Sequence, residues 1–177
     1  MLADRRRLLR AALVLCVAAA MLTAAVAPAV TTRATPRKIT PSGVGTVKLG
    51  KTYTALRRAR AVGRITRGCE LEGPNARQAP LRSPLKGFVE FSQSSPRKVT
   101  NISIRGGATA RGVGIGASQA RVKRAFPRVR FDRSKEARFD VIIGKVSRSA
   151  GGPFEFAIVS MTKTVTAIGI PKIKFCE

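Results

Sequence analysis

The sequence predicts an α+β fold made of two tandem 66-residue repeats, each a short helix followed by about three antiparallel strands. The first observation is a ten-residue stretch, residues 50–59, that recurs at residues 116–125. The second is a Val-Thr-x-Ile-x-Ile pattern, present at residues 99–104 and again at residues 165–170 with the same offset and no gap. A repeated unit that cannot bury its own apolar face buries it against its neighbour, so we expect the helices to pack on one face of a shared sheet.

Residues 1–29 have the layout of an export signal peptide. Four arginines lie within the first ten residues, residues 11–30 carry no charge, and Ala27-Pro28-Ala29 is a small-x-small cleavage pattern. The paired arginines also resemble the twin-arginine export signal, so both export routes remain open. Left uncut, residues 11–30 would anchor the chain, because about 20 uncharged residues can span a bilayer. In either case the sequence predicts a secreted or extracytoplasmic protein.

The chain is strongly basic, with 34 basic and nine acidic residues, no histidine and a net charge of +25. Cleavage after Ala29 would leave 30 basic and eight acidic residues, so the exported part would keep a net charge of +22. Such a field favours polyanionic partners, such as acidic wall polymers or lipid head groups. The alternative is a soluble surface that is rich in arginine through compositional bias alone.

Residues 30–42 are rich in Thr, Pro and Ser and nearly free of apolar side chains, which predicts a flexible linker. We divide the remainder into repeat 1, residues 43–110, and repeat 2, residues 111–177, which together form one compact unit. A chain of this length suits one domain in which two small repeats share a core.

Each repeat begins with a turn glycine and a helix cap. In repeat 1, Gly50 is the turn residue, and Thr52 is placed to cap a helix whose apolar positions recur every three residues. We expect this helix to end at Gly63. In repeat 2, Ser118 takes the cap position, and Pro127 ends the helix because proline disfavours helical backbone at the residue before it.

Sequence rich in aromatic and β-branched residues follows each helix and predicts the strands. Apolar and polar residues alternate in residues 98–104 and 164–170, which predicts a sheet with one buried and one exposed face. Small residues on the exposed face would leave room for a protein partner, and they are Asn101, Ser103, Ala167 and Gly169. Further strands are expected at residues 70–72, 87–92, 139–146, 153–160 and 173–175.

Cysteine usage agrees with export. Cys16 lies in the signal segment, which leaves Cys69 and Cys176 as an even pair in an oxidising compartment. A disulfide between them is the default expectation. It would join repeat 1 to the end of repeat 2 and stabilise the fold by about 4–5 kcal/mol at most, because it closes a long loop.

The repeat motif carries a family resemblance. Residues 49–56 read Leu-Gly-x-Thr-x-x-x-Leu, and residues 115–122 follow the same pattern as Ile-Gly-x-Ser-x-x-x-Val. This tandem unit, in an exported protein, resembles the beta-lactamase inhibitor protein fold and the small lipoprotein of the outer-membrane barrel assembly machinery. The resemblance implies binding to other proteins without catalysis, and it assigns no functional residue. The chain departs from these families because it has no lipid-attachment cysteine and no clear second helix in either repeat.

The residues that most catalytic sites need are missing. Without histidine, Ser-His-Asp and Cys-His nucleophile activation and the commonest metal ligand are excluded. The close carboxylates are Glu70 with Glu72 and Asp132 with Glu136, so a carboxylate-dependent hydrolase is the enzymatic alternative. We expect these carboxylates to pair with neighbouring arginines instead. We therefore expect no catalysis, no cofactor and no metal.

Basic residues gather on the two predicted helices and just after them, at equivalent places in the two repeats. If the repeats pack side by side, these residues could form one continuous cationic surface. The candidates for anion binding are Arg57, Arg58, Arg60, Arg64, Arg121, Lys123, Arg124, Arg128 and Arg130. Nucleic acid is not an expected partner, because an exported protein does not ordinarily meet it and because stacking aromatic residues are scarce. A membrane is an expected partner only if the N-terminal segment stays uncut.

The sequence thus predicts an exported, non-catalytic binding protein that engages a protein partner or an anionic component of the cell envelope. The alternative is a polyanion binder, of wall polymer or lipid head groups, that acts through the helix-side arginines.

Overall fold

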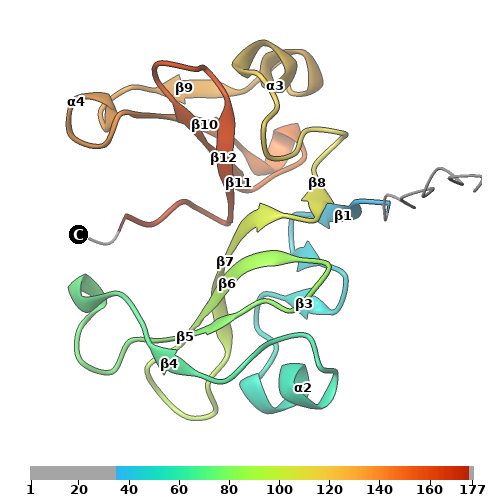
Figure 1. Cartoon of the computed structure of the whole chain (residues 1–177), viewed down its shortest axis with the longest axis vertical. Coiled ribbons are helices and arrows are strands. Elements are labelled where there is room, and N and C mark those ends of the chain that lie inside the picture. The colour runs from blue at the N-terminus through green and yellow to red at the C-terminus, as the bar shows by residue number, and fades with distance from the viewer. Residues whose placement is uncertain (1–34, 176–177) are drawn as a thin grey trace, which may run out of the picture. The chain divides into compact units, whose positions relative to one another are not determined.

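Three α-helices and twelve strands make up the part of the chain that the computed structural model describes, residues 35–175 (Figure 1). This content confirms the predicted α+β fold class. The predicted signal segment and Cys176 lie outside the described residues. Within residues 35–175, no helix is long and apolar enough to cross a membrane.

Eight antiparallel strands form the main sheet, in the order β4-β5-β6-β7-β12-β11-β10-β9. β7 and β12 lie at its centre and join the two halves, with Ile104 opposite Ile168 and Ile102 opposite Ile170. Each half contributes four strands, one more than the sequence suggested. The strands are β4 (Thr66–Arg67), β5 (Arg77–Pro80), β6 (Lys86–Phe91), β7 (Val99–Gly106), β9 (Arg130–Asp132), β10 (Val141–Val146), β11 (Phe154–Val159) and β12 (Val165–Ile170).

A small second sheet corrects the predicted flexible linker, because β1 (Arg37–Thr40) lies inside residues 30–42. β1 pairs antiparallel with β2 (Gly43–Val44) and parallel with β8 (Ala108–Thr109), and β2 pairs in turn with β3 (Val47–Lys48). Ile39 of β1 is only 4% exposed and belongs to the apolar core. One buried isoleucine among charged and hydroxyl residues gives too short a pattern to identify a strand from sequence.

The 66-residue offset of the sequence recurs in the hydrogen bonds of the two halves. In each half the turn glycine donates a backbone hydrogen bond to the last main-sheet strand of that half, β7 or β12, and the cap residue forms an isolated bridge beside it. The matched contacts are Gly50 N to Val99 O and Gly116 N to Val165 O, both 2.8 Å, and the bridges Thr52–Lys98 and Ser118–Thr164. These contacts are consistent with the interpretation of the chain as two repeats.

Both predicted helix caps are present. Thr52 caps α2 (Tyr53–Arg58) and Ser118 caps α3 (Gln119–Ala125). Each hydroxyl accepts a hydrogen bond from the backbone N–H three residues later, at 3.2 Å and 3.3 Å. Pro127 follows α3 as expected, because it cannot continue the helix.

α2 ends before Gly63, where we expected its end. The Arg60 N–H donates to Arg57 O at 3.0 Å. The Ala61 N–H donates to Leu56 O, also at 3.0 Å. These two bonds form the Schellman motif, which closes a helix on a left-handed residue. That residue is Arg60, with φ of 53°, at a position where glycine is most common.

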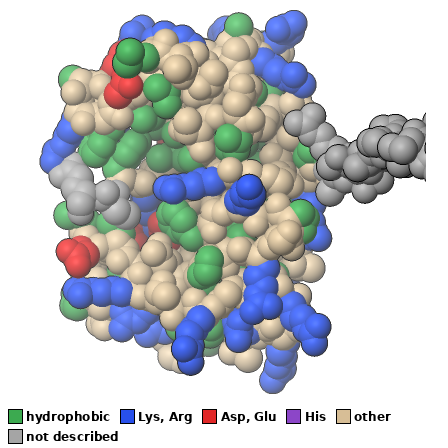
Figure 2. Space-filling model, viewed as in Figure 1, with side chains coloured by type: hydrophobic (Ala, Val, Ile, Leu, Met, Phe, Trp, Pro, Cys, Tyr) green, Lys and Arg blue, Asp and Glu red, His purple; other side chains and the backbone are tan. Residues whose placement is uncertain are grey.

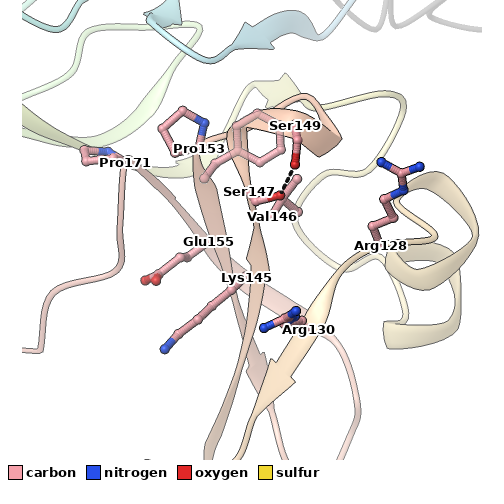
Figure 3. A pocket seen from close by; sticks show the side chains of 10 residues that line it. Arg128, Arg130, Lys145, Val146, Ser147, Ser149, Pro153, Glu155 and Pro171 are labelled. Atoms are coloured by element: carbon pink, nitrogen blue, oxygen red, sulfur yellow. Dashed lines mark hydrogen bonds between the residues drawn. The ribbon is translucent and has the colours of Figure 1, made fainter.

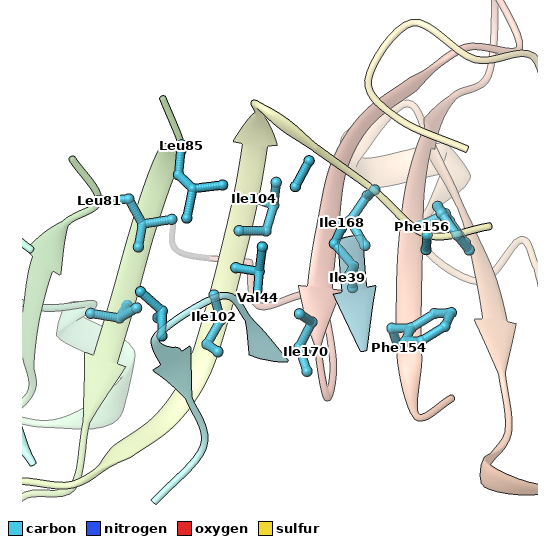
Figure 4. Close-up of a cluster of buried hydrophobic side chains, with 14 of the residues drawn as sticks. Ile39, Val44, Leu81, Leu85, Ile102, Ile104, Phe154, Phe156, Ile168 and Ile170 are labelled. Carbon is cyan, nitrogen blue, oxygen red and sulfur yellow. The ribbon is translucent and has the colours of Figure 1, made fainter. Parts of the chain in front are cut away.

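The core lies between the helices and one face of the main sheet. α2 and α3 each bury one residue in it, Leu56 and Val122. The core runs across both halves of the sheet without a break (Figure 4). Its central residues are Ile102, Ile104, Ile168 and Ile170, all 0% exposed. Sharing one core suits two halves that are each too small to bury enough apolar surface alone.

A short second helix lies in each half, where sequence analysis found none. η1 (Glu70–Glu72) is a 3-10 helix and corrects the strand expected there, and α4 (Glu136–Phe139) begins 66 residues later. The first glutamate of each helix pairs with an arginine three residues before it, at 3.9 Å for Arg67 and 2.5 Å for Arg133. Helices of three and four residues are too short to produce a hydrophobic period, so the sequence could not reveal them.

The chain after β12 does not form the strand expected at residues 173–175. We call residues 171–175 the C-terminal segment. It lies against the face of the sheet opposite the core and is held there by side chains. The Ile173 N–H donates to Glu155 Oε2 at 2.8 Å, and the Phe175 ring stacks on Phe139 with 4.6 Å between centroids.

Candidate anion-binding site

All nine basic residues predicted to bind anions are exposed. They form two separate groups, because the halves meet through β7 and β12 and leave α2 and α3 at opposite ends of the described fold (Figure 1). Figure 2 shows Lys and Arg side chains gathered at both ends of this view. The prediction that these residues form one continuous cationic surface is therefore wrong.

Little of this charge is neutralised within the fold. Residues 35–175 hold 29 basic and seven acidic residues. None of the nine candidates forms an ion pair with a carboxylate of the described residues. Ion pairs between described residues use four other cations, which are Arg67, Arg133, Lys145 and Lys174.

A cleft of about 660 Å³ lies beside Arg128 and Arg130, the last two of the nine candidates (Figure 3). Lys145 of β10 also lines it and lies directly opposite Arg130 of β9 in the strand ladder. The hydroxyls of Ser147 and Ser149, 3.0 Å apart, line the cleft as well. The cleft therefore presents three cations and two hydroxyl groups, which are donors suited to an anion.

Two carboxylates offset part of this charge. Lys145 Nζ donates to Asp132 at 2.7 Å, and this hydrogen bond holds the pKa of Asp132 far below its usual value. The same contact raises the pKa of Lys145, so Lys145 stays charged. Glu155 lines the cleft, but one of its oxygens accepts a backbone N–H of the C-terminal segment. Arg128 and Arg130 keep charges that no described carboxylate pairs with.

Two smaller clefts lie beside α3. One, of about 320 Å³, is lined by Arg121, Arg124 and Ala125. The other, of about 220 Å³, is lined by Arg111 and Phe126 among others. The Arg111 guanidinium lies over the Phe126 ring, 5.1 Å from its centroid, and donates to Ala125 O at 3.5 Å. The side chain of Arg111 is therefore held against the end of α3.

Sequence reasoning missed Arg111, Lys145, Ser147 and Ser149. A comparison of the two repeats position by position would have found Arg111, because Gly45 stands 66 residues before it. Lys145 has no such signal, because its place opposite Arg130 follows from the register of β9 and β10. Ser147 and Ser149 lie at the N-cap of and within η2 (Arg148–Ala150), a 3-10 helix after β10 that is too short for the sequence to reveal.

The sheet face predicted to bind a protein partner is not open, which corrects that expectation. Asn101 is 2% exposed and Ser103 is 9% exposed, while Gly169 is buried and Ala167 is half-buried. A side chain at Gly169 would meet Lys172 O at 2.2 Å, because the C-terminal segment packs there. Strand alternation identified this face, but it gave no sign that the last residues fold over it.

Buried charge helps to hold the C-terminal segment on this face. Lys174 forms ion pairs with Glu72 and with Glu90, which is 3% exposed. Burial raises the pKa of Glu90, and the contact with Lys174 opposes that rise. Asn101 lies opposite Glu90, and its Oδ1 is buried with no hydrogen-bond partner within residues 35–175. Such a buried ion pair adds little net stability. Removing one partner is nevertheless strongly destabilising, because it leaves the other charge buried and unpaired.

Each of the four close carboxylates pairs with a cation, and the pairs are Glu70 with Arg67, Glu72 with Lys174, Asp132 with Lys145 and Glu136 with Arg133. Arg133 donates to Glu136 at 2.5 Å and lowers the pKa of Glu136, while Lys145 lowers the pKa of Asp132. A hydrolytic general acid needs a raised pKa and contact with substrate. Glu90 has a raised pKa, but it is buried. This arrangement gives no support to the hydrolase alternative.

Within the described part of the chain, no three His, Cys, Asp or Glu side chains gather as a metal site would require. Neither a protein-family model, nor a curated protein, nor a solved structure matches this chain. The candidate site therefore rests on its own geometry and charge.

Proposed function

We propose that this is an exported, non-catalytic binding protein that engages an anionic component of the cell envelope through its exposed arginines and lysines. The observation that carries the proposal is the excess of basic over acidic residues, 29 to seven, within residues 35–175. Because the nine candidate cations are exposed and have no carboxylate partner among the described residues, their field acts on the surroundings.

The burial of the sheet face favours an envelope polyanion over a protein partner. Asn101 and Ser103, which we expected to contact a protein, are buried. The C-terminal segment packs at their ladder neighbours, on Glu90 beside Asn101 and at Gly169 beside Ser103. Protein interfaces centre on apolar and aromatic anchors that lie together. The large hydrophobic side chains exposed within residues 35–175 are Leu71, Ile115 and Met161, which lie far apart in the sequence and on different loops and helices.

Export is part of the proposal and rests on the charge pattern of residues 1–29, which lie outside the described residues. The resemblance of the repeat motif to beta-lactamase inhibitor proteins supports binding without catalysis. It does not bear on the nature of the partner.

Co-sedimentation of the purified protein with isolated cell walls, anionic vesicles and neutral vesicles, over a salt series, tests this proposal. We expect the protein to pellet with walls or anionic vesicles at low salt and to be released as salt rises. Exposed charges lose their attraction beyond the Debye length, about 10 Å at 0.1 M salt. Protein that stays in the supernatant even at low salt would overturn the proposal. Binding that survives high salt would indicate a specific protein partner instead.

A further inference from the structure

We infer that the three clefts around α3 form one cationic track that binds an extended phosphodiester polymer of the cell envelope. This inference rests on the proposed function and goes further, because it names the site and the chemical class of the ligand. It assigns the specific contacts to the second half of the chain and leaves the α2 end to general electrostatic attraction.

The three clefts adjoin one another. Those of about 660 Å³ and 220 Å³ share Arg128 and Ser149 in their linings. The cleft of about 320 Å³ meets the second of these where the guanidinium of Arg111 donates to Ala125 O at 3.5 Å. Along the track the cations are Arg121, Arg124, Arg111, Arg128, Arg130 and Lys145.

Arg111 occupies a backbone position that arginine disfavours. Its φ is 48°, in the left-handed region, within a two-residue turn closed by hydrogen bonds between Ala110 and Val113 at 2.8 Å and 2.9 Å. Turns of this kind prefer Gly, Asn or Asp, and Gly45 stands at the matching position of the first half. The turn itself therefore does not favour the arginine, and its contacts with Phe126 and Ala125 O hold the guanidinium at the edge of the clefts. A residue kept at an unfavourable backbone position in a cleft points to function.

Arg130 and Lys145 are a second unfavourable feature of the same track. They lie directly opposite each other on neighbouring strands, where like charges destabilise a sheet. In the other half, the like pair Arg67–Arg77 is relieved within the fold. Arg77 donates to two backbone carbonyls at 2.8 Å and 2.9 Å, and Arg67 pairs with a glutamate. In the second half Lys145 pairs with Asp132 at 2.7 Å, but the Arg130 side chain has no hydrogen bond or ion pair among residues 35–175, so an external anion would relieve its charge.

The track is confined to the second half of the chain. Arg111, Arg128 and Lys145 correspond, 66 residues earlier, to Gly45, Val62 and Ala79. Val62 and Ala79 are both 0% exposed and belong to the core. Arg124 and Arg130 do have arginines at the matching positions, Arg58 and Arg64, so the halves differ in Arg111, Arg128 and Lys145. That difference is expected where only one half carries the binding site.

The chemistry of the track fits phosphate groups on a chain. Five of its six cations are arginines, whose planar guanidinium binds two phosphate oxygens at once. Ser147 and Ser149 share one hydrogen bond, so one of their two hydroxyls can still donate to a phosphate. A single phosphate would occupy one cleft. A flexible polymer with a phosphate in every unit would occupy all three, and each contact would raise the effective concentration for the next.

The test measures binding of the full chain to poly(glycerol phosphate), with inorganic phosphate and poly-L-glutamate as comparison ligands, by calorimetry at several salt concentrations. The track variant is Arg111→Gly with Arg128→Gln and Arg130→Gln. The matched control removes three exposed charges outside both basic groups, by Arg82→Gln, Lys86→Gln and Lys98→Gln. Circular dichroism and thermal unfolding of both variants identify any variant that fails to fold.

We expect the track variant to bind poly(glycerol phosphate) at least tenfold more weakly, because one charge-assisted hydrogen bond alone is worth roughly that factor. The magnitude of the slope of log affinity against log salt should decrease by about 2. Three phosphate contacts are lost, and each had released about 0.7 of a counterion. The control should lose much less affinity and keep most of the slope. Wild type should bind the polymer more tightly than inorganic phosphate.

Equal losses in the track variant and the control would overturn the track while leaving the proposed function intact, because the whole field would then bind the polymer. Binding of inorganic phosphate as tight as that of the polymer would overturn the extended site. Equal or tighter binding of poly-L-glutamate would overturn the preference for phosphodiester. If wild type binds none of these ligands, nor cell walls or anionic vesicles, the proposed function fails as well. If the triple variant unfolds, the single variant Arg130→Gln replaces it and Lys86→Gln serves as its control. Their losses of affinity for poly(glycerol phosphate) are then compared in the same way.

Discussion

Arg111 and Gly45 occupy the same turn position in the two halves, 66 residues apart, and both have a left-handed backbone, with φ of 48° and 55°. The fold needs a positive φ at this position in both halves, and glycine meets that need without steric cost. The second half keeps an arginine there instead. Its guanidinium lies 5.1 Å from the centroid of the Phe126 ring and beside the cationic clefts of α3.

Glycine substitutions at the two left-handed arginines should affect stability differently. Arg60→Gly should raise the free energy of unfolding by about 1 kcal/mol, because a non-glycine residue in this conformation costs about 1–2 kcal/mol. Arg111→Gly should raise it by less, because relief of the backbone is offset by loss of a cation–π contact worth about 0.5–1 kcal/mol. Urea unfolding of both variants measures the difference.

Arg60→Ala is the control for this comparison, because it removes the same charge and keeps a side chain at positive φ. It should not stabilise the protein. Equal stabilisation by Arg60→Gly and Arg111→Gly would show that the contacts of the Arg111 side chain contribute nothing to folding.

Removal of Lys174 should destabilise the protein strongly. Lys174 pairs with Glu90, which is 3% exposed, so Lys174→Met would leave a buried carboxylate without its partner. Breaking a buried pair in this way costs about 3–5 kcal/mol. Chemical denaturation measures the loss, and Glu90→Gln in the same chain should restore much of it.

Lys172→Met gives the matched control, because Lys172 is exposed and lies in the same C-terminal segment. Its unfolding free energy should stay within about 0.5 kcal/mol of wild type. A similar effect of the two substitutions would mean that net charge, and not the buried pair, is responsible.

The raised pKa of Glu90 predicts how its contribution to stability depends on pH. Burial raises this pKa above the ordinary value of 4.5, so the folded state binds the proton more tightly than the unfolded state. The contribution of Glu90 is then fully present below about pH 4.5 and is lost as pH rises through the folded-state pKa. The unfolding free energy of wild type minus that of Glu90→Gln should therefore decrease as pH rises above 4.5, because only wild type loses the contribution of Glu90.

Asp132 and Glu136 have lowered pKa values and act in the opposite direction, because their contribution is lost as pH falls. Both residues are unchanged in Glu90→Gln, so their effect cancels in the difference. A difference that stays constant or increases above pH 4.5 would contradict the raised pKa.

The sequence predicted the features that depend on short patterns. Thr52 and Ser118 cap the helices as expected, because a cap acts within three residues. The alternation of β7 placed Ile102 and Ile104 correctly in the core. What sequence could not predict depends on contacts between distant residues. The burial of Asn101 and Ser103 accompanies the packing of the C-terminal segment at their ladder neighbours Glu90 and Gly169. The position of Lys145 opposite Arg130 follows from strand register.

The candidate site shows the same division. The exposure of the helix-side arginines was predicted because they lie off the apolar stripe of each helix. Their separation into two groups was not predicted, because it depends on which strands join the halves. β7 and β12 join them, and this places α2 and α3 far apart.

The Cys69–Cys176 disulfide stays a prediction, because Cys176 lies outside the described residues, and one contact supports it. Lys174, two residues before Cys176, binds Glu72, three residues after Cys69. We expect Cys69→Ser to lower the free energy of unfolding by about 2–5 kcal/mol, as removal of a disulfide that closes a long loop does. Urea unfolding with and without reductant measures this loss. Reductant should destabilise wild type to the level of Cys69→Ser and leave that variant unchanged. If wild type and Cys69→Ser respond equally to reductant, or if Cys69 and Cys176 both react with a thiol reagent before reduction, the two cysteines are not joined.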